Sequence, residues 1–153
     1  MSRLETRLPP PLVALLVVLA MAATRLLPER LPLDRSWRLA GAVVLAGAGL
    51  AFAVPAIVAF RRARTTTNPL RIEAASALVT SGVFALSRNP MYVGLAAIVC
   101  AIALLVGTPW AALGPVLFVA YITRFQIVPE ERLLAARFGT PYRDWCRRVR
   151  RWL

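Results

Sequence analysis

Four apolar runs, separated by short polar segments, restrict what this chain of 153 residues can fold into. The clearest run, residues 39–60, contains no charged side chain. A helix of about 20 apolar residues crosses the hydrocarbon core of a bilayer, where each segment must satisfy its own backbone hydrogen bonds. We therefore predict an all-α membrane protein, with the whole chain forming one domain and with spans at residues 9–27, 38–60, 90–106 and 110–128.

The first run has a second interpretation. Residues 12–23 are uninterrupted apolar sequence, which is short for a span unless the flanking residues join it. Residues 20–22, Ala-Met-Ala, resemble the cleavage site that follows the apolar core of a signal peptide. We expect the run to be retained as a span, because the rest of the chain is also membrane sequence, and cleavage is the alternative.

The second run is rich in small residues, among them Gly41, Gly47 and Gly49. In membrane proteins small residues let helix backbones approach closely. The pattern predicts tight packing of this span, and it permits a homodimer without requiring one.

The net charge of +12 arises without any Lys or His. A basic chain can bind nucleic acid, but these arginines lie in clusters between apolar runs, which fits anionic lipid headgroups better. Residues 61–88 and the C-terminal tail hold most of the arginines, whereas the turn at 107–109 holds none. The positive-inside rule therefore predicts cytoplasmic N- and C-termini, and we expect a bacterial inner membrane.

Metal and disulfide chemistry find little support in the sequence. There is no His, and the two cysteines lie apart, Cys100 within the third run and Cys146 in the basic tail. This composition predicts neither a metal site nor a disulfide framework.

Two polar segments mark the ends of neighbouring runs. Residues 80–94 lead into the third run, where Asn89 is a good N-cap and Pro90 suits the first helical turn. Residues 129–132, Pro-Glu-Glu-Arg, close the fourth run. Because residues 107–109 predict a tight turn, the two spans form an antiparallel hairpin whose far ends meet.

Each polar residue at these ends has a plain structural explanation by itself. Glu130 and Glu131 suit the positive end of a helix dipole. Arg124, inside the fourth run, could extend its charge to the membrane surface, and Asn89 could simply begin a helix. Their convergence with Tyr92 at one end of the hairpin favours a site for a zwitterionic or cationic ligand, whose ammonium or sugar hydroxyls a carboxylate would accept.

The C-terminal tail predicts an amphipathic helix. Its large apolar residues recur at spacings of three and four, which places them on one helical face: Phe138, Tyr142, Trp145, Val149 and Trp152. Arginines fill much of the remaining surface. A helix of this type lies in the membrane interface.

Four motifs, in order and correctly separated, resemble those of the isoprenylcysteine carboxyl methyltransferase and phospholipid methyltransferase family. Residues 80–84, Thr-Ser-Gly-Val-Phe, resemble its Thr-x-Gly-Pro-Tyr turn, and residues 88–94, Arg-Asn-Pro-Met-Tyr-Val-Gly, its Arg-His-Pro-x-Tyr-x-Gly helix start. Residues 130–134 match its Glu-Glu-x-x-Leu segment, and residues 138–142 its Phe-Gly-x-x-Tyr tail. The resemblance covers about residues 65–153.

The resemblance implies S-adenosylmethionine held at the cytosolic membrane face and a lipophilic acceptor that enters from the bilayer. The residues that would bind the cofactor are Gly82, Phe84, Arg88, Asn89, Pro90, Tyr92, Glu130 and Glu131. By this analogy Gly82 and Phe84 line the cofactor, and Asn89 and Tyr92 bind its polar groups. Glu130 or Glu131 fixes its amino end or ribose. Both glutamates are catalytic candidates, as is Arg124, whose position alone suggests that it orients the polar head of the acceptor.

Two departures from the family pattern bear on the chemistry. Val83 replaces the usual Pro, and Asn89 replaces the usual His. Asn cannot act as a base near neutral pH. Methyl transfer from a sulfonium depends mainly on positioning, and a carboxylate or thiolate acceptor needs no base. We therefore favour an acceptor that is already anionic.

The predicted function is S-adenosylmethionine-dependent methyl transfer to a small lipophilic or lipid-like acceptor. N-methylation of a phospholipid amine is the alternative reaction. A non-catalytic membrane protein that binds a lipid or a partner is the alternative class. The two enzyme hypotheses require Glu130, Glu131 and Tyr92 to gather with Asn89 around one cavity.

Overall fold

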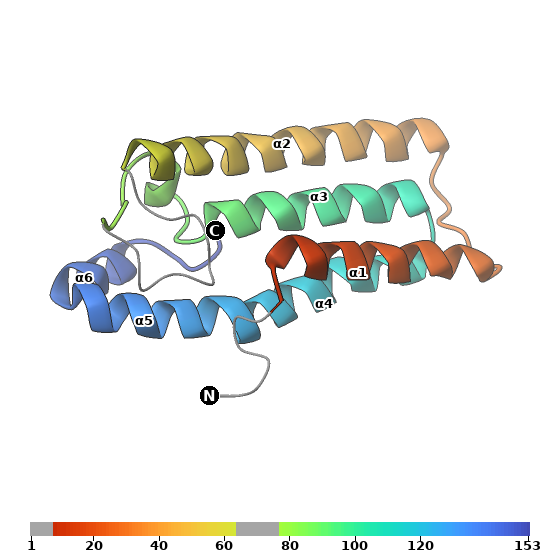
Figure 1. Cartoon of the computed structure of the whole chain (residues 1–153). Helices are drawn as coiled ribbons and strands as arrows, with labels where there is room; N and C mark the ends of the chain where they lie inside the picture. Colours follow the sequence, from red (N-terminus) through yellow and green to blue (C-terminus); the bar gives the residue numbers. More distant parts are fainter. Residues whose placement is uncertain (1–7, 64–76) are drawn as a thin grey trace.

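The computed structural model describes residues 8–63 and 77–153, and these residues form helices and connecting loops without a strand. Helix α2 packs along α3, and α1 packs against both α3 and α4 (Figure 1). The helices are α1 (Pro10–Ala23), α2 (Arg35–Arg62), α3 (Pro90–Val106), α4 (Leu113–Ile122), α5 (Val128–Phe138) and α6 (Thr140–Arg148). Short helical segments join them: η1 (Thr24–Leu26), η3 (Gly82–Ala85), η4 (Pro109–Ala112) and η5 (Thr123–Ile127).

The described residues contain two helices that are long and apolar enough to cross a membrane: α2, and the continuous helix Pro109–Phe138. Two shorter apolar helices, Pro10–Leu26 and Pro90–Val106, pack beside them. Many large apolar side chains point outward, as expected where lipid rather than water surrounds a protein: examples are Leu19, Val43, Val44, Val116 and Leu117. The all-helical prediction is therefore confirmed for the described residues.

The helix of the fourth apolar run continues beyond residue 128, where the sequence suggested the end of a span. The helix runs through Pro129 into α5, and its π-helical segment η5 lies immediately before that proline. Proline lacks the N–H that would bond to the preceding turn, and a local π adjustment is one way in which a helix accommodates this loss. The continuity fixes Glu130 relative to the apolar part of the same helix.

Glycines bring α2 and α3 into backbone contact. A Cβ atom on Gly94 would lie 2.5 Å from the carbonyl oxygen of Gly49, and one on Gly49 would lie 2.7 Å from the carbonyl oxygen of Gly94. By contrast, a Cβ on Gly47 would meet nothing within 4 Å. The close packing expected for the second span thus occurs within one chain, between Gly49 and Gly94.

The C-terminal helix differs from the expected interfacial helix. Helix α6 ends at Arg148, and Val149 is extended, with φ −121° and ψ 132°. Tyr142 and Trp145 are buried against the cluster that contains Phe84. The prediction that one helical face continues to Trp152 is therefore wrong, because the helix ends at Arg148.

Candidate functional site

The start of α3 and the first turn of α5 meet at one end of the helical hairpin. Gly107, with φ +74°, ends α3 in the left-handed conformation that glycine adopts easily, and the chain reverses into η4. At the far end the Tyr92 hydroxyl donates a 2.5 Å hydrogen bond to Oε1 of Glu130. The convergence that the sequence predicted for these two residues is present.

Glu131 lies between two guanidinium groups. Its Oε1 is 3.1 Å from a terminal nitrogen of Arg88. Arg151 approaches from the C-terminal segment and donates to both carboxylate oxygens, at 3.1 Å and 2.7 Å. These hydrogen bonds raise the pKa of the Arg151 guanidinium above its ordinary value. Two guanidinium groups therefore balance the charge of the Glu131 carboxylate, and both of its oxygens accept hydrogen bonds.

Asn89 occupies the N-cap position of α3, but its side chain does not cap the helix. Instead its Nδ2 donates to the carbonyl oxygen of Arg151 at 2.9 Å. The fully buried Ser87 donates to the same oxygen at 3.4 Å and accepts from the Asn89 backbone N–H at 3.1 Å. The side chain proposed to contact a cofactor is thus tied to the C-terminal segment.

The C-terminal segment, residues 149–153, lies across the start of α3, where the C-terminus is seen in Figure 1. The backbone N–H of Arg88 donates to the carbonyl oxygen of Arg150 at 2.9 Å. The indole N–H of Trp152 donates to Thr123 Oγ1 at 3.2 Å. The last residues therefore border a group of side chains formed by Arg88, Asn89, Tyr92, Glu130 and Glu131, which we call the polar site.

Two candidates from the turn before α3 lie in different surroundings. Phe84 is only 3% exposed, packs 4.9 Å from the Phe60 ring, and accepts a 3.1 Å hydrogen bond from Trp145 through its carbonyl oxygen. Gly82 is exposed, with φ +63° and open space around its Cα. Pro90 is buried in the first turn of α3. Phe84 thus belongs to the apolar cluster beneath the turn, while Gly82 faces outward.

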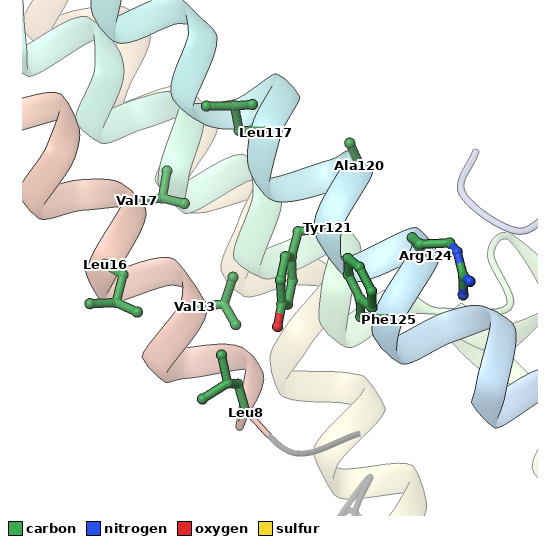
Figure 2. A pocket seen from close by; sticks show the side chains of 9 residues that line it. All are labelled: Leu8, Val13, Leu16, Val17, Leu117, Ala120, Tyr121, Arg124 and Phe125. Carbon is green, nitrogen blue, oxygen red and sulfur yellow. The ribbon is translucent and has the colours of Figure 1, made fainter. Parts of the chain in front are cut away.

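Arg124 lies in η5 and lines an apolar groove between α1 and α4 (Figure 2). Its guanidinium is 5.4 Å from the centre of the Phe125 ring. None of the polar-site residues lines this groove. Arg124 therefore lies at a groove that is separate from the polar site.

Sequence reasoning missed Ser87, Arg151 and Trp152, which border the polar site. Arg151 belongs to a run of arginines, a pattern that predicts binding to lipid headgroups. No sequence feature distinguishes Arg151 from its neighbour Arg150. The signal is tertiary, because the chain turns back after α6 and delivers one arginine of the run to Glu131.

The two adjacent glutamates consequently have different environments. Glu131 already has two cationic partners, whereas the described hydrogen bond of Glu130 comes from a neutral phenol. A carboxylate beside a phenol can still attract an ammonium group or accept from hydroxyls. Arg88 and Asn89 supply donors suited to a carboxylate. The polar site thus has the chemistry to hold a zwitterionic ligand.

Comparison with known proteins agrees with the motifs. The family model described as phospholipid methyltransferase matches residues 37–141. An uncharacterized protein of Haemophilus influenzae is 43% identical over 63 residues, which are 41% of this chain and the whole of that protein. No solved structure matches the chain significantly.

Proposed function

Because this chain belongs to the phospholipid methyltransferase family, we propose that it transfers the methyl group of S-adenosylmethionine to a lipophilic or lipid-like acceptor at the membrane surface. The observation that carries the proposal is the Tyr92–Glu130 hydrogen bond. It joins two segments within the family match at one end of a hairpin of apolar helices.

We propose that all four apolar helices cross the bilayer. Helix α3 has 17 residues and therefore rises about 25 Å, close to the hydrocarbon thickness of about 30 Å. Helix α1 with η1 covers Pro10–Leu26. The arginine-rich tail supports a cytoplasmic position for the polar site and for both termini.

The polar site fits the cofactor in the chemistry of its groups. S-adenosylmethionine carries a carboxylate, an ammonium and ribose hydroxyls. Nε of Arg88 is buried and has no hydrogen-bond partner within residues 8–63 and 77–153. Arg88 and Asn89 would hold the carboxylate, and Glu130 would hold the ammonium or the ribose. When bound, the cofactor would supply an electrophilic methyl group on a positively charged sulfur.

The protein side of the reaction is mainly positioning. Tyr92 orients the Glu130 carboxylate through its hydroxyl. Glu131 pairs with Arg88, which precedes α3, and with Arg151 in the C-terminal segment, and so holds these parts of the chain against α5. The Tyr92–Glu130 hydrogen bond is partly buried, and an electrostatic contact with a ligand is stronger there than in water.

An already anionic acceptor is favoured because the chain has no His and position 89 holds Asn. N-methylation of a phospholipid amine is the second candidate, and one observation supports it: Glu130, with a neutral partner, could take the proton that a protonated amine must lose. The family description also names phospholipids.

Calorimetry on the purified full-length protein in detergent tests the cofactor assignment. We expect micromolar binding of S-adenosylmethionine by the wild type. Glu130→Gln should weaken it by about tenfold, because a charged hydrogen bond of about 1.5 kcal/mol is lost. Glu29→Gln, in the connector before α2, is the matched control and should bind like the wild type.

Two results would count against the proposal. Folded wild-type protein that binds no cofactor, with and without added lipid, would favour a non-catalytic membrane protein. Cofactor binding without methyl transfer to any lipid extract would point the same way. Transfer of radiolabelled methyl to the amine or to the acidic lipid fraction separates the two enzymatic candidates.

A further inference from the structure

An apolar groove of about 540 Å³ runs between α1 and α4 (Figure 2). This volume lies within the range of about 300–1,000 Å³ that is usual for small-molecule sites. Apart from Arg124, its lining residues are uncharged: Leu8, Val13, Leu16, Val17, Leu117, Ala120, Tyr121 and Phe125. A hydrocarbon chain is the kind of ligand that such a lining would hold in a membrane.

One end of the groove is cationic. Arg124 lies beside Phe125 in η5, on the side of the groove away from Leu16 (Figure 2). The start of α1 is level with η5, because the buried Gln126 donates to the carbonyl oxygen of Leu8 at 2.5 Å. Arg124 is therefore at the end of the span where α1 begins, which is the depth of lipid headgroups rather than of acyl chains.

A second polar group borders the groove. The Tyr121 hydroxyl is buried and has no hydrogen-bond partner in the described part of the chain, although its ring packs 4.8 Å from that of Phe125. Tyr121 precedes Arg124 by three residues, or nearly one helical turn. A buried donor without an acceptor is costly. In Figure 2 the Tyr121 hydroxyl and the Arg124 guanidinium point in different directions, with Phe125 between them, so they would meet different parts of a ligand.

We propose that this groove binds one anionic glycerophospholipid of the surrounding bilayer, with an acyl chain between α1 and α4 and the phosphate at Arg124. The cation and the apolar lining each match one part of that molecule. A second copy of this chain is a poorer match for the groove. It would supply apolar side chains but no anionic group at a defined position beside Arg124. The inference requires a membrane location and does not depend on methyl transfer, since no residue of the polar site lines the groove.

Native mass spectrometry of the delipidated full-length protein tests the site with dioleoylphosphatidylglycerol and dioleoylphosphatidylcholine. The wild type should retain one phosphatidylglycerol molecule in preference to phosphatidylcholine. Arg124→Gln should weaken phosphatidylglycerol binding by about fivefold, the effect of one arginine at an anionic surface. Arg143→Gln removes the same charge from an exposed position on α6 and should change binding by less than about twofold.

A second pair of variants tests the apolar part. Leu117→Trp fills the groove and should displace both lipids. Leu113→Trp places the same side chain on an exposed position of α4 outside the groove and should bind lipid like the wild type. Circular dichroism verifies that every variant retains its helices.

Three outcomes would overturn the inference. Equal weakening by Arg124→Gln and Arg143→Gln would mean a general effect of net charge. Unchanged lipid binding by Leu117→Trp would mean that lipids contact the protein surface non-specifically and do not occupy the groove. A dimer that forms on delipidation and disappears in Leu117→Trp would assign the groove to a second copy of the chain.

Discussion

Arg151 holds both carboxylate oxygens of Glu131, at 3.1 Å and 2.7 Å, and thereby ties the last residues of the chain to α5. The pair lies where Arg88 also reaches Glu131, so α5, the start of α3 and the C-terminal segment meet at one carboxylate. This junction lies beside Tyr92 and Glu130 in the polar site.

Loss of the Arg151 side chain should loosen that junction. We expect Arg151→Gln to lower the melting temperature by about 2–4 °C, the effect of about 1 kcal/mol for a partly exposed pair in a chain of this size. Arg150→Gln is the control, because Arg150 is exposed and neighbours Arg151 in the same run. Thermal unfolding followed by circular dichroism measures both, and equal melting temperatures would remove the structural role of the pair.

The Tyr92 hydroxyl should matter more than the Tyr121 hydroxyl. Tyr92→Phe leaves the Glu130 oxygen without its donor and should cost about 1–3 kcal/mol of stability. In delipidated protein, Tyr121→Phe removes a hydroxyl that has no partner in the described residues, so it should be neutral or stabilising. Unfolding of both variants in the same detergent checks the contrast, and the reverse order of stability would contradict the observed contact.

Close packing of α2 on α3 predicts a glycine contrast. Gly94→Ala places a Cβ 2.5 Å from the Gly49 carbonyl oxygen and should destabilise by about 1–3 kcal/mol as the helices separate. Gly47→Ala meets nothing within 4 Å and should change stability little, with a slight gain from helix propensity. If the two variants unfold alike, α2 and α3 do not approach as described.

The burial of α6 can be tested at Trp145. Trp145→Phe loses the hydrogen bond to the Phe84 carbonyl oxygen and should cost about 1 kcal/mol. Trp110→Phe changes an exposed tryptophan at the other end of the hairpin and should cost less. Fluorescence adds an independent measurement: Trp145 should be poorly quenched by brominated lipids, whereas strong quenching would return α6 to the membrane interface.

Local pattern was sufficient for much of the fold. Helix α3 starts at Pro90, where the sequence placed it, and η4 starts at Pro109, inside the turn predicted at residues 107–109. The turn through Gly107 made the hairpin predictable, and the hairpin in turn made the meeting of Tyr92 and Glu130 predictable. These features depend on neighbours in the chain, so a sequence pattern can report them.

The end of the fourth apolar helix could not be predicted in the same way. Pro129 predicts a break, and in the structure η5 accommodates it within a continuous helix. The sequence pattern placed the aromatic face of α6 on lipid, although an amphipathic helix can equally place that face on protein. The presence of Phe84 and its carbonyl oxygen beneath Trp145 decided for protein.

The sequence by itself determined an all-helical chain, apolar helices of membrane character, the hairpin and the family motifs. Only the tertiary structure decided how the two glutamates are paired: Glu131 with Arg88 and Arg151, and Glu130 with Tyr92. It also decided that Arg124 lines a separate groove. The physical reason is range. Helix propensity and hydrophobic periodicity act over a few residues, whereas the partner of a charged side chain is chosen among groups brought together from distant parts of the chain.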